Sequence, residues 1–360
     1  MGQGATDPPS LPNPICNGST TWGNPPSLIY ENYILDAYWA ASQYAYYLQN
    51  QFNCPKGYFQ RHKNRYGIYE ICDTITPIFI AEGEFFDNTH WKEYFTLGIY
   101  DGRDFPDTCY RYAIIIGSPG TGHNPRASID DVVHEYAHIF SKQCWNPRFS
   151  TIYIEDNRLA EACADIWAAI ITHEIYPNDE DKIWKIGEDV VLPNSGYSCI
   201  RNLAVPNDPT AEMQMDTCIC QSSGGSAYQQ SGIISHWFYL LTHGFSGEGC
   251  DGNCYIFTAM PIDSAAKLIY NCEMNYFERN MAFSDIVRAT IEAAAIFSSP
   301  EEYLPSICGA WNVVGARSCD YDIYSDLPEI AQYGLSLTGV NNGDYYVISD
   351  IVVDSLETLN

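Results

Sequence analysis

The sequence predicts an α+β protein of two lobes, a mixed β/α lobe followed by a mainly helical lobe. The chain has 360 residues, enough for two modest cores, and 46% of them are hydrophobic, as is usual in globular proteins. Short β-like runs such as 76–81 and 112–116 lie in the first half, whereas helical spacing dominates from about residue 128. This order favours two lobes with a cleft between them.

Helical periodicity defines the individual elements. Apolar and aromatic residues recur at helical spacing from Ile34 to Gln51, which predicts an amphipathic helix in the first lobe. Further helices are predicted at 128–142, 157–174, 231–244, 261–276, 282–298 and 301–314. The resulting division is an N-terminal β/α lobe (1–142), a helical lobe (143–317) and an acidic extension (318–360). In the extension, Asn342-Gly343 between two apolar runs predicts a β-hairpin.

The net charge of −27, from 45 acidic and 18 basic residues, excludes some partners. Nucleic acids and anionic membrane surfaces both attract basic proteins, so we expect neither partner. No run of about 18 apolar residues is present, so we also expect no membrane insertion. The oligomeric state is not indicated by the sequence.

Fourteen cysteines, an even number, are scattered along the chain. Such a pattern is typical of disulfides in secreted proteins, and the Asn17-Gly18-Ser19 sequon fits the same location. We therefore expect an extracellular, disulfide-bonded glycoprotein in which Cys163, inside a helical pattern, is a buried free thiol. A metal site is the less favoured alternative for four of the cysteines, Cys218, Cys220, Cys250 and Cys254.

His134-Glu135-Tyr136-Ala137-His138 has the spacing of a metal site built on one helix. Residues four apart lie about 40° apart around a helix, so both imidazoles face the same side and can bind one Zn²⁺. Glu135 lies about 100° away around the helix and can reach a water at the metal. A surface helix with two solvated histidines is the alternative interpretation.

A third ligand is available on the next predicted helix, where Glu161 and Asp165 are also four residues apart. Glu161 would complete a His₂Glu zinc site, and Asp165 would accept a hydrogen bond from a ligating imidazole. Acidic residues are also favoured in the first turn of any helix, which is the alternative for this pair taken alone. Together with the paired histidines, the pattern predicts zinc as the cofactor.

The HExxH sequence followed by Glu161-x3-Asp165 resembles the thermolysin family of secreted neutral endopeptidases. Four further segments are similar to that family in the same order, so that the resemblance covers about residues 34–317. These segments are Leu35-Asp36-Ala37-Tyr38-Trp39, Asn88-Thr89-His90-Trp91, Cys199-Ile200-Arg201-Asn202 and Ser231-Gly232-Ile233-Ile234. The resemblance implies a thermolysin-like fold, a zinc cleft between the lobes, and a protein or peptide substrate.

The resemblance also implies roles for individual residues. Glu135 would be the general base that takes a proton from the attacking water and passes it to the leaving amine. Tyr153 would donate a hydrogen bond to the oxyanion, and Arg201 would bind the carbonyl of the scissile region. Asn88 and its neighbour Thr89 would hold the substrate backbone.

Two substitutions depart from the family pattern. Tyr228 lies where the family has a histidine that stabilises the tetrahedral oxyanion. A phenol can donate a hydrogen bond but cannot carry positive charge, and losing one such electrostatic donor costs about a hundredfold in rate. Asp131 lies where the family has an apolar residue in its leucine-preferring pocket.

The calcium ligands of the family are matched only in part. Asp130 and Glu188 correspond to two ligands of its double calcium site, whereas Thr172 and Lys185 fall where carboxylates are expected. Calcium is therefore a candidate second metal, with Asp130 and Glu188 as its candidate ligands.

Three functions are compatible with these residues. An active zinc endopeptidase is favoured, because the metal ligands, the base Glu135 and the substrate arginine are all present. The alternative is a secreted scaffold or binding protein that keeps the fold but has lost catalysis, which Tyr228 and the acidic extension motivate. A zinc aminopeptidase would fit the ligand spacing, but no separate amine-binding glutamate motif accompanies it.

Overall fold

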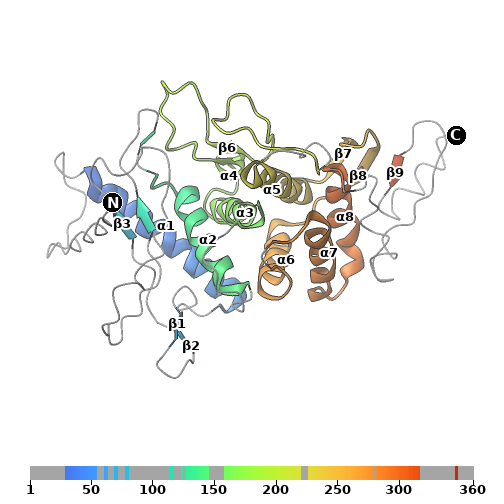
Figure 1. Cartoon of the computed structure of the whole chain (residues 1–360), viewed down its shortest axis with the longest axis horizontal. Helices are drawn as coiled ribbons and strands as arrows, with labels where there is room; N and C mark the ends of the chain where they lie inside the picture. The colour runs from blue at the N-terminus through green and yellow to red at the C-terminus, as the bar shows by residue number, and fades with distance from the viewer. Residues whose placement is uncertain are drawn as a thin grey trace, which may run out of the picture.

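The computed structural model describes residues 29–54, 61–63, 69–71, 78–80, 114–116, 123–124, 126–145, 158–219, 226–278, 280–316 and 345–347. Helices make up most of this part of the chain, with α3 near the middle and the others around it (Figure 1). The helices are α1 (Ile29–Phe52), α2 (Ile129–Cys144), α3 (Arg158–Ile175), α4 (Glu180–Trp184), α5 (Ala227–His243), α6 (Ile262–Asn275), α7 (Phe283–Ala293) and α8 (Leu304–Val313). Single turns of 3-10 helix, η3 (Ala294–Ile296) and η4 (Pro300–Glu302), lie between α7 and α8.

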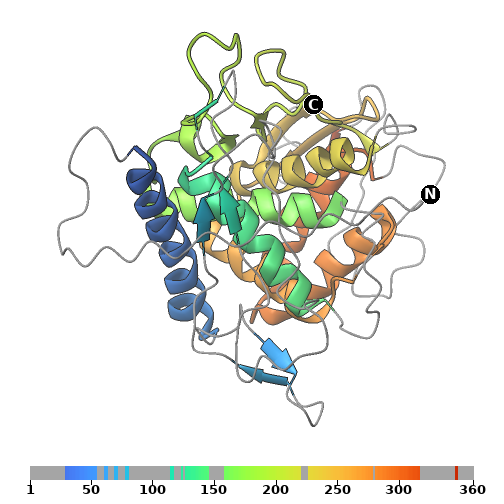
Figure 2. The same ribbon diagram turned by 60° about the vertical axis from the view of Figure 1, so that its left-hand side comes forward.

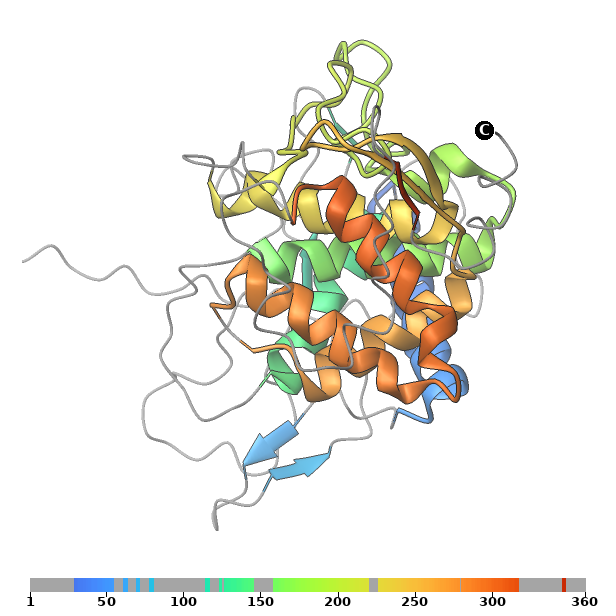
Figure 3. The same cartoon turned by 90° about the vertical axis from the view of Figure 1, so that its right-hand side faces the viewer.

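The strands are short and form small separate sheets. In the first lobe, β1 (Arg61–Lys63) pairs antiparallel with β2 (Tyr69–Ile71), and β3 (Ile78–Ile80) pairs in parallel with β4 (Ile114–Ile116). After α4, β5 (Lys185–Ile186) pairs antiparallel with β6 (Arg201–Asn202). This pairing holds Arg201 beside the end of α4. The hairpin of β7 (Phe245–Glu248) and β8 (Cys254–Phe257) takes β9 (Tyr345–Val347) as a parallel third strand (Figure 3).

The sequence predicted most of these elements and missed a few. Each predicted helical window coincides with a helix, while α4 and the β7–β8 hairpin were not expected. Within the acidic extension, the structure describes only β9, which pairs with β8. The predicted hairpin partner at 335–338 lies outside the described residues, so the hairpin and the lobe boundaries stay predictions.

Helices α2 and α3 lie side by side at the centre of the molecule. Helix α1 runs along α2 and covers one side of this pair (Figure 2). The indole of Trp167 on α3 contacts Tyr44 of α1 and Phe140 of α2, with ring centroids 5.7 and 6.1 Å apart, and all three side chains are fully buried. Because dense aromatic packing resists displacement, α2 and α3 keep a fixed relative position.

Helices α5 and α8 pack through two buried tryptophans. The rings of Trp237 and Trp311 stack with centroids 4.6 Å apart. Trp237 donates its indole N–H to the Ile307 carbonyl at 3.2 Å, and Trp311 donates to the Thr290 hydroxyl at 2.8 Å. Both polar groups are thus satisfied in the core, as burial requires. At the start of α5, Ser226 and Gln229 form a capping box that fixes where the helix begins.

The described cysteines include one disulfide, Cys218–Cys250, so the alternative metal site that uses both of these thiols is wrong. Cys163 is buried and free, as expected. Cys254 and Cys272 are also free. Five further cysteines lie outside the described residues, at positions 16, 72, 109, 220 and 319, so the expectation that most cysteines are bonded stays a prediction. The sequon at Asn17 also lies outside them. No described helix is long and apolar enough to cross a membrane.

We expect Trp311→Ala to reduce the free energy of unfolding by about 3–5 kcal/mol, because it leaves a cavity against Trp237 and removes the partner of Thr290. Chemical denaturation followed by circular dichroism measures the change. The exposed Val205→Ala serves as the control and should stay within about 0.5 kcal/mol of the unchanged protein. A loss below about 1 kcal/mol for Trp311→Ala would contradict the described packing of α5 on α8.

Candidate metal centre

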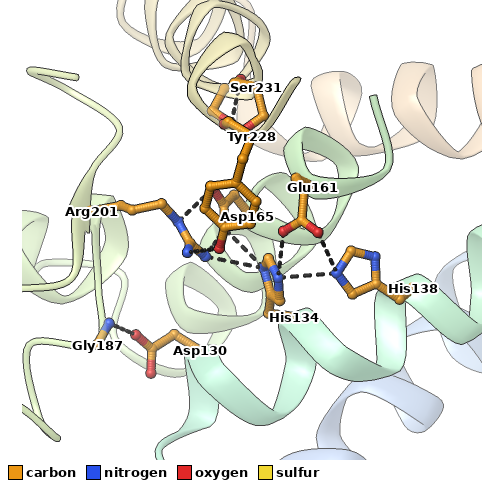
Figure 4. A network of polar contacts seen from close by, with 10 residues as sticks. Asp130, His134, His138, Glu161, Asp165, Gly187, Arg201, Tyr228 and Ser231 are labelled. Atoms are coloured by element: carbon orange, nitrogen blue, oxygen red, sulfur yellow. Dashed lines mark hydrogen bonds and ion pairs between the residues drawn. The ribbon is translucent and has the colours of Figure 1, made fainter. Parts of the chain in front are cut away.

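Three potential metal ligands converge where α2 meets α3. Nε2 of His134 lies 3.1 Å from Nε2 of His138, and the two oxygens of Glu161 lie 3.3 and 3.5 Å from these nitrogens (Figure 4). The ligand atoms of His134, His138 and Glu161 all lie within 4.8 Å of one another. Among the described residues, this is the group of three histidine, cysteine or carboxylate side chains that could hold a metal ion. Tetrahedral zinc with ligands at about 2.0–2.1 Å has its ligand atoms about 3.3 Å apart. The three side chains therefore fit zinc.

Local helix chemistry explains how the ligands come together. Asp130 and Asp131 lie in the first turn of α2, where negative charge stabilises the positive end of the helix dipole. The helix then continues without a break through both histidines. The side chains of His134 and His138 are one turn apart and leave only 8% and 12% of their area exposed. Glu161 lies in the first turn of α3, which packs directly against α2.

Asp165 orients the first histidine. Its carboxylate lies 2.8 Å from Nδ1 of His134, and both side chains are buried. With Nδ1–H donated to Asp165, Nε2 faces Glu161 and His138, and once this nitrogen gives up its proton its lone pair is directed at the metal position. Burial lowers the pKa of His134, but hydrogen bonds to Asp165 and Glu161 outweigh it and raise that pKa to about 10. Burial raises the pKa of Glu161, but the two imidazoles outweigh it and hold that pKa well below its usual range.

Arg201 extends this network away from the histidines. Its Nε and Nη2 donate to the two oxygens of Asp165 at 3.1 and 2.6 Å, a two-pronged ion pair in a buried setting. Burial raises the pKa of Asp165, but the Arg201 charge and the contact with His134 outweigh it and lower that pKa. Nη1 of Arg201 donates to the Tyr228 hydroxyl at 2.6 Å. One guanidinium group thus joins Asp165, and through it His134, to Tyr228.

Tyr228 faces the metal ligands from the first turn of α5 (Figure 4). Its ring packs against the guanidinium of Arg201, 5.5 Å from the central carbon, and the Ser231 hydroxyl donates to its carbonyl at 2.7 Å. Burial raises the pKa of Tyr228, Arg201 opposes this, and the charges of Glu161, Asp165 and Glu135 raise it further. The phenol therefore stays protonated at neutral pH. Since its oxygen accepts from Arg201, its own O–H is not used in that bond and can donate to another group.

The structure tests only part of the expected site. Tyr153, Asn88 and Thr89 lie outside the described residues, so their roles stay predictions. Asp131 is buried and accepts a hydrogen bond from the Ser128 hydroxyl at 2.8 Å. The ion pair of Arg201 with Asp165 was not expected, because the two residues are 36 positions apart and no local spacing connects them.

The candidate calcium ligands lie in a different setting. Asp130 accepts a hydrogen bond from the Gly187 backbone N–H. Glu188 and Asp189 share the ammonium of Lys182, at 3.4 and 2.5 Å from their carboxylate oxygens. Burial, followed by the neighbouring acids, raises the pKa of both Asp130 and Glu188. Lys182 contacts only one oxygen of Glu188, and the other is buried without a hydrogen-bond partner, so calcium at Asp130 and Glu188 stays a prediction.

Residues 155–316 match the family model of the thermolysin metallopeptidase, alpha-helical domain. A relative, the bacillolysin of Bacillus cereus, is 25% identical over 193 residues, which cover 52% of this chain and 32% of that protein. The chain thus matches about a third of the length of this relative. The solved structure of the precursor of protealysin, a metalloproteinase from Serratia proteamaculans, superposes with a TM-score of 0.54 at 16% identity. That match covers 81% of this chain and 80% of the protealysin precursor. The chain has the two-lobed thermolysin-like fold that the sequence predicted.

We expect millimolar calcium to raise the melting temperature of the zinc-loaded protein by a few degrees, because a cation bound at Asp130 and Glu188 would satisfy the buried, unpartnered oxygen of Glu188 and would bind preferentially to the folded state. Differential scanning calorimetry in metal-stripped buffer measures the shift. Asp130→Asn should abolish the rise. A shift below about 1 °C in the unchanged protein would remove calcium from these residues.

Proposed function

We propose that this chain is a divergent member of the thermolysin family of metallopeptidases and a zinc-dependent endopeptidase acting on proteins or peptides. The observation that supports the proposal most directly is the convergence of His134, His138 and Glu161 at the spacing of a tetrahedral zinc. The two histidines and one carboxylate leave one position for the reactants, as in catalytic zinc sites.

A bound zinc would act as a Lewis acid, lower the pKa of the attacking water and polarise the scissile carbonyl. Glu135, buried on α2 beside the ligands, is the proposed general base. Its charge adds to the effects that raise the pKa of the Tyr228 hydroxyl. Glu135 would accept the proton of the water and pass it to the leaving amine, the two proton transfers that peptide hydrolysis requires.

Tyr228 and Arg201 are the proposed donors for the negative charge that develops on the carbonyl oxygen. Arg201 is held by Asp165 and in turn holds the Tyr228 hydroxyl, so both groups are oriented before a substrate arrives. Preorganised donors stabilise a transition state because they do not have to reorient during the reaction. Tyr153 is the proposed further oxyanion donor. Asn88 and Thr89 are the proposed contacts to the substrate backbone.

The proposed location is extracellular. The Cys218–Cys250 disulfide supports it, because such bonds persist in oxidising compartments. The strongly acidic composition is compatible with a soluble protein outside the cell.

A second candidate function is a thermolysin-like scaffold that binds zinc and does not catalyse. The presence of Tyr228 favours it, because a neutral phenol stabilises an oxyanion less than an imidazolium would. Turnover separates the two functions, since both retain the metal.

We expect the purified protein to hold one zinc and to cleave an unstructured protein such as casein in a chelator-sensitive manner. Glu135→Gln should keep the zinc and lose at least about a hundredfold in kcat, because an amide cannot accept the proton of the water. Zinc content is measured by atomic emission and turnover by release of fluorescent peptides. Zinc without casein cleavage in the unchanged protein would favour the scaffold, and no zinc at all would overturn both functions.

We expect Tyr228→Phe to lower kcat by about a hundredfold with little change in zinc content, because it removes one oriented donor while leaving the metal ligands in place. Tyr228→His should keep or raise activity, since a ring N–H also donates. Both variants are compared at saturating peptide. Equal activity in Tyr228→Phe and the unchanged protein would remove Tyr228 from the proposed oxyanion site.

A further inference from the structure

A buried carboxyl group lies behind the metal ligands, between three helices. Glu273 on α6 is completely shielded from solvent. One of its oxygens accepts from the Ser141 hydroxyl of α2 at 2.5 Å, and the other accepts from the Trp167 indole of α3 at 2.5 Å. Helix α6 packs against both of these helices (Figure 1). A single side chain therefore joins the helix of His134 and His138 to the helix of Glu161.

The positions along the two helices make this link relevant to the metal. Ser141 follows His134 by seven residues, close to two full turns, so both lie on nearly the same face of α2. Trp167 lies two residues beyond Asp165, which contacts His134. One polar link between α2 and α3 therefore lies at the metal ligands, and the link through Glu273 lies further along the pair. Two separated links oppose both sliding and rotation of one helix against the other.

Packing alone does not account for an acid at this position. Burying a carboxyl costs free energy, and an apolar residue of similar volume often serves a core equally well or better. Burial raises the pKa of Glu273 to about 7, against the lowering effect of its two donors. In return, two directional hydrogen bonds define the distance between the donors more narrowly than apolar contacts do. A metal site needs its helices to be positioned this accurately, because metal–ligand distances must lie within about 0.2 Å of their ideal values.

We propose that Glu273 is a positioning residue that sets α3 against α2 so that Glu161 meets His134 and His138 at the spacing zinc requires. This inference rests on the proposed zinc site. Glu273 touches neither metal nor substrate, and acts through the side chains of α2 and α3 that it contacts, chiefly Ser141 and Trp167. Its removal should therefore weaken zinc binding beyond what the loss of stability explains.

Glu273→Leu removes both acceptors at similar volume and is the primary variant. We expect zinc affinity, measured by competition with a chromophoric chelator, to fall by at least about tenfold, as for other residues that orient metal ligands. The absorption bands of the cobalt-substituted protein should also change, because they report the arrangement of the ligands. Glu273→Gln should recover most of the affinity, since its amide oxygen can accept from Trp167 while its N–H donates to the Ser141 oxygen.

The matched control lies on the same helix. Asn271 is also buried on α6, but it donates to the Ala293 carbonyl at 2.9 Å, next to α7 and away from the metal helices. Asn271→Leu should lower the melting temperature of the metal-free protein while zinc affinity stays within about twofold. If Glu273→Leu does not fold, Trp167→Phe, which removes a single donor, replaces it in the same comparison.

The outcomes separate the inference from the proposed function. If the unchanged protein binds zinc and Glu273→Leu, or its replacement Trp167→Phe, binds zinc equally well with an unaltered cobalt spectrum, Glu273 is a structural core residue and the inference is overturned. If the Asn271→Leu control weakens zinc binding as much as the Glu273 variant does, the effect reflects stability alone and the inference is again overturned. Failure of the unchanged protein to bind zinc would overturn the proposed function and this inference with it.

Discussion

The carboxylate of Asp165 is the interaction on which the rest of the site depends. It contacts Nδ1 of His134 on one side and receives two N–H donors from Arg201 on the other. Removing this charge would leave a buried guanidinium without its partner, which costs about 3–5 kcal/mol. It would also leave His134 without the group that fixes its tautomer, which costs about 10–100-fold in metal affinity. The ligand geometry and the orientation of Arg201 therefore have a common cause.

The charges of the site balance locally, although the chain as a whole carries a net charge of −27. Buried acids persist because each has a donor close by. Asp165 has Arg201, Glu161 has the two imidazoles, and Glu273 has Ser141 and Trp167. The Glu188 cluster is less well balanced, since Lys182 contacts one oxygen of Glu188 and leaves the other buried without a partner. The same principle, that buried charge is paired, thus accounts for the metal centre and for our expectation that a cation stabilises the Glu188 cluster.

Sequence reasoning was strongest where function imposes a local spacing. Two pairs of residues four apart, His134 with His138 and Glu161 with Asp165, indicated one face of each helix, and these faces meet in the structure. Contacts between distant residues could not be foreseen in this way. The Arg201–Asp165 ion pair and the Glu273 bridge join positions at least 36 apart. The first depends on the placement of the β5–β6 pair beside α3, and the second on the packing of α2, α3 and α6. An acid in the interior of the predicted helix 261–276, between Cys272 and Met274, was the available signal for Glu273.

The structure also gives a physical reason why a neutral residue can stand at position 228. Nη1 of Arg201 lies 2.6 Å from the Tyr228 oxygen, so a second cation at this position would be repelled at close range in a buried environment. The guanidinium already supplies positive charge, and the phenol adds an oriented O–H whose raised pKa keeps its proton in place. In this arrangement the charge resides on Arg201 and the short-range hydrogen bond on Tyr228. An imidazolium would supply both the positive charge and the hydrogen bond. Here Arg201, held by Asp165, supplies the charge, and Tyr228, held by Arg201, supplies the hydrogen bond.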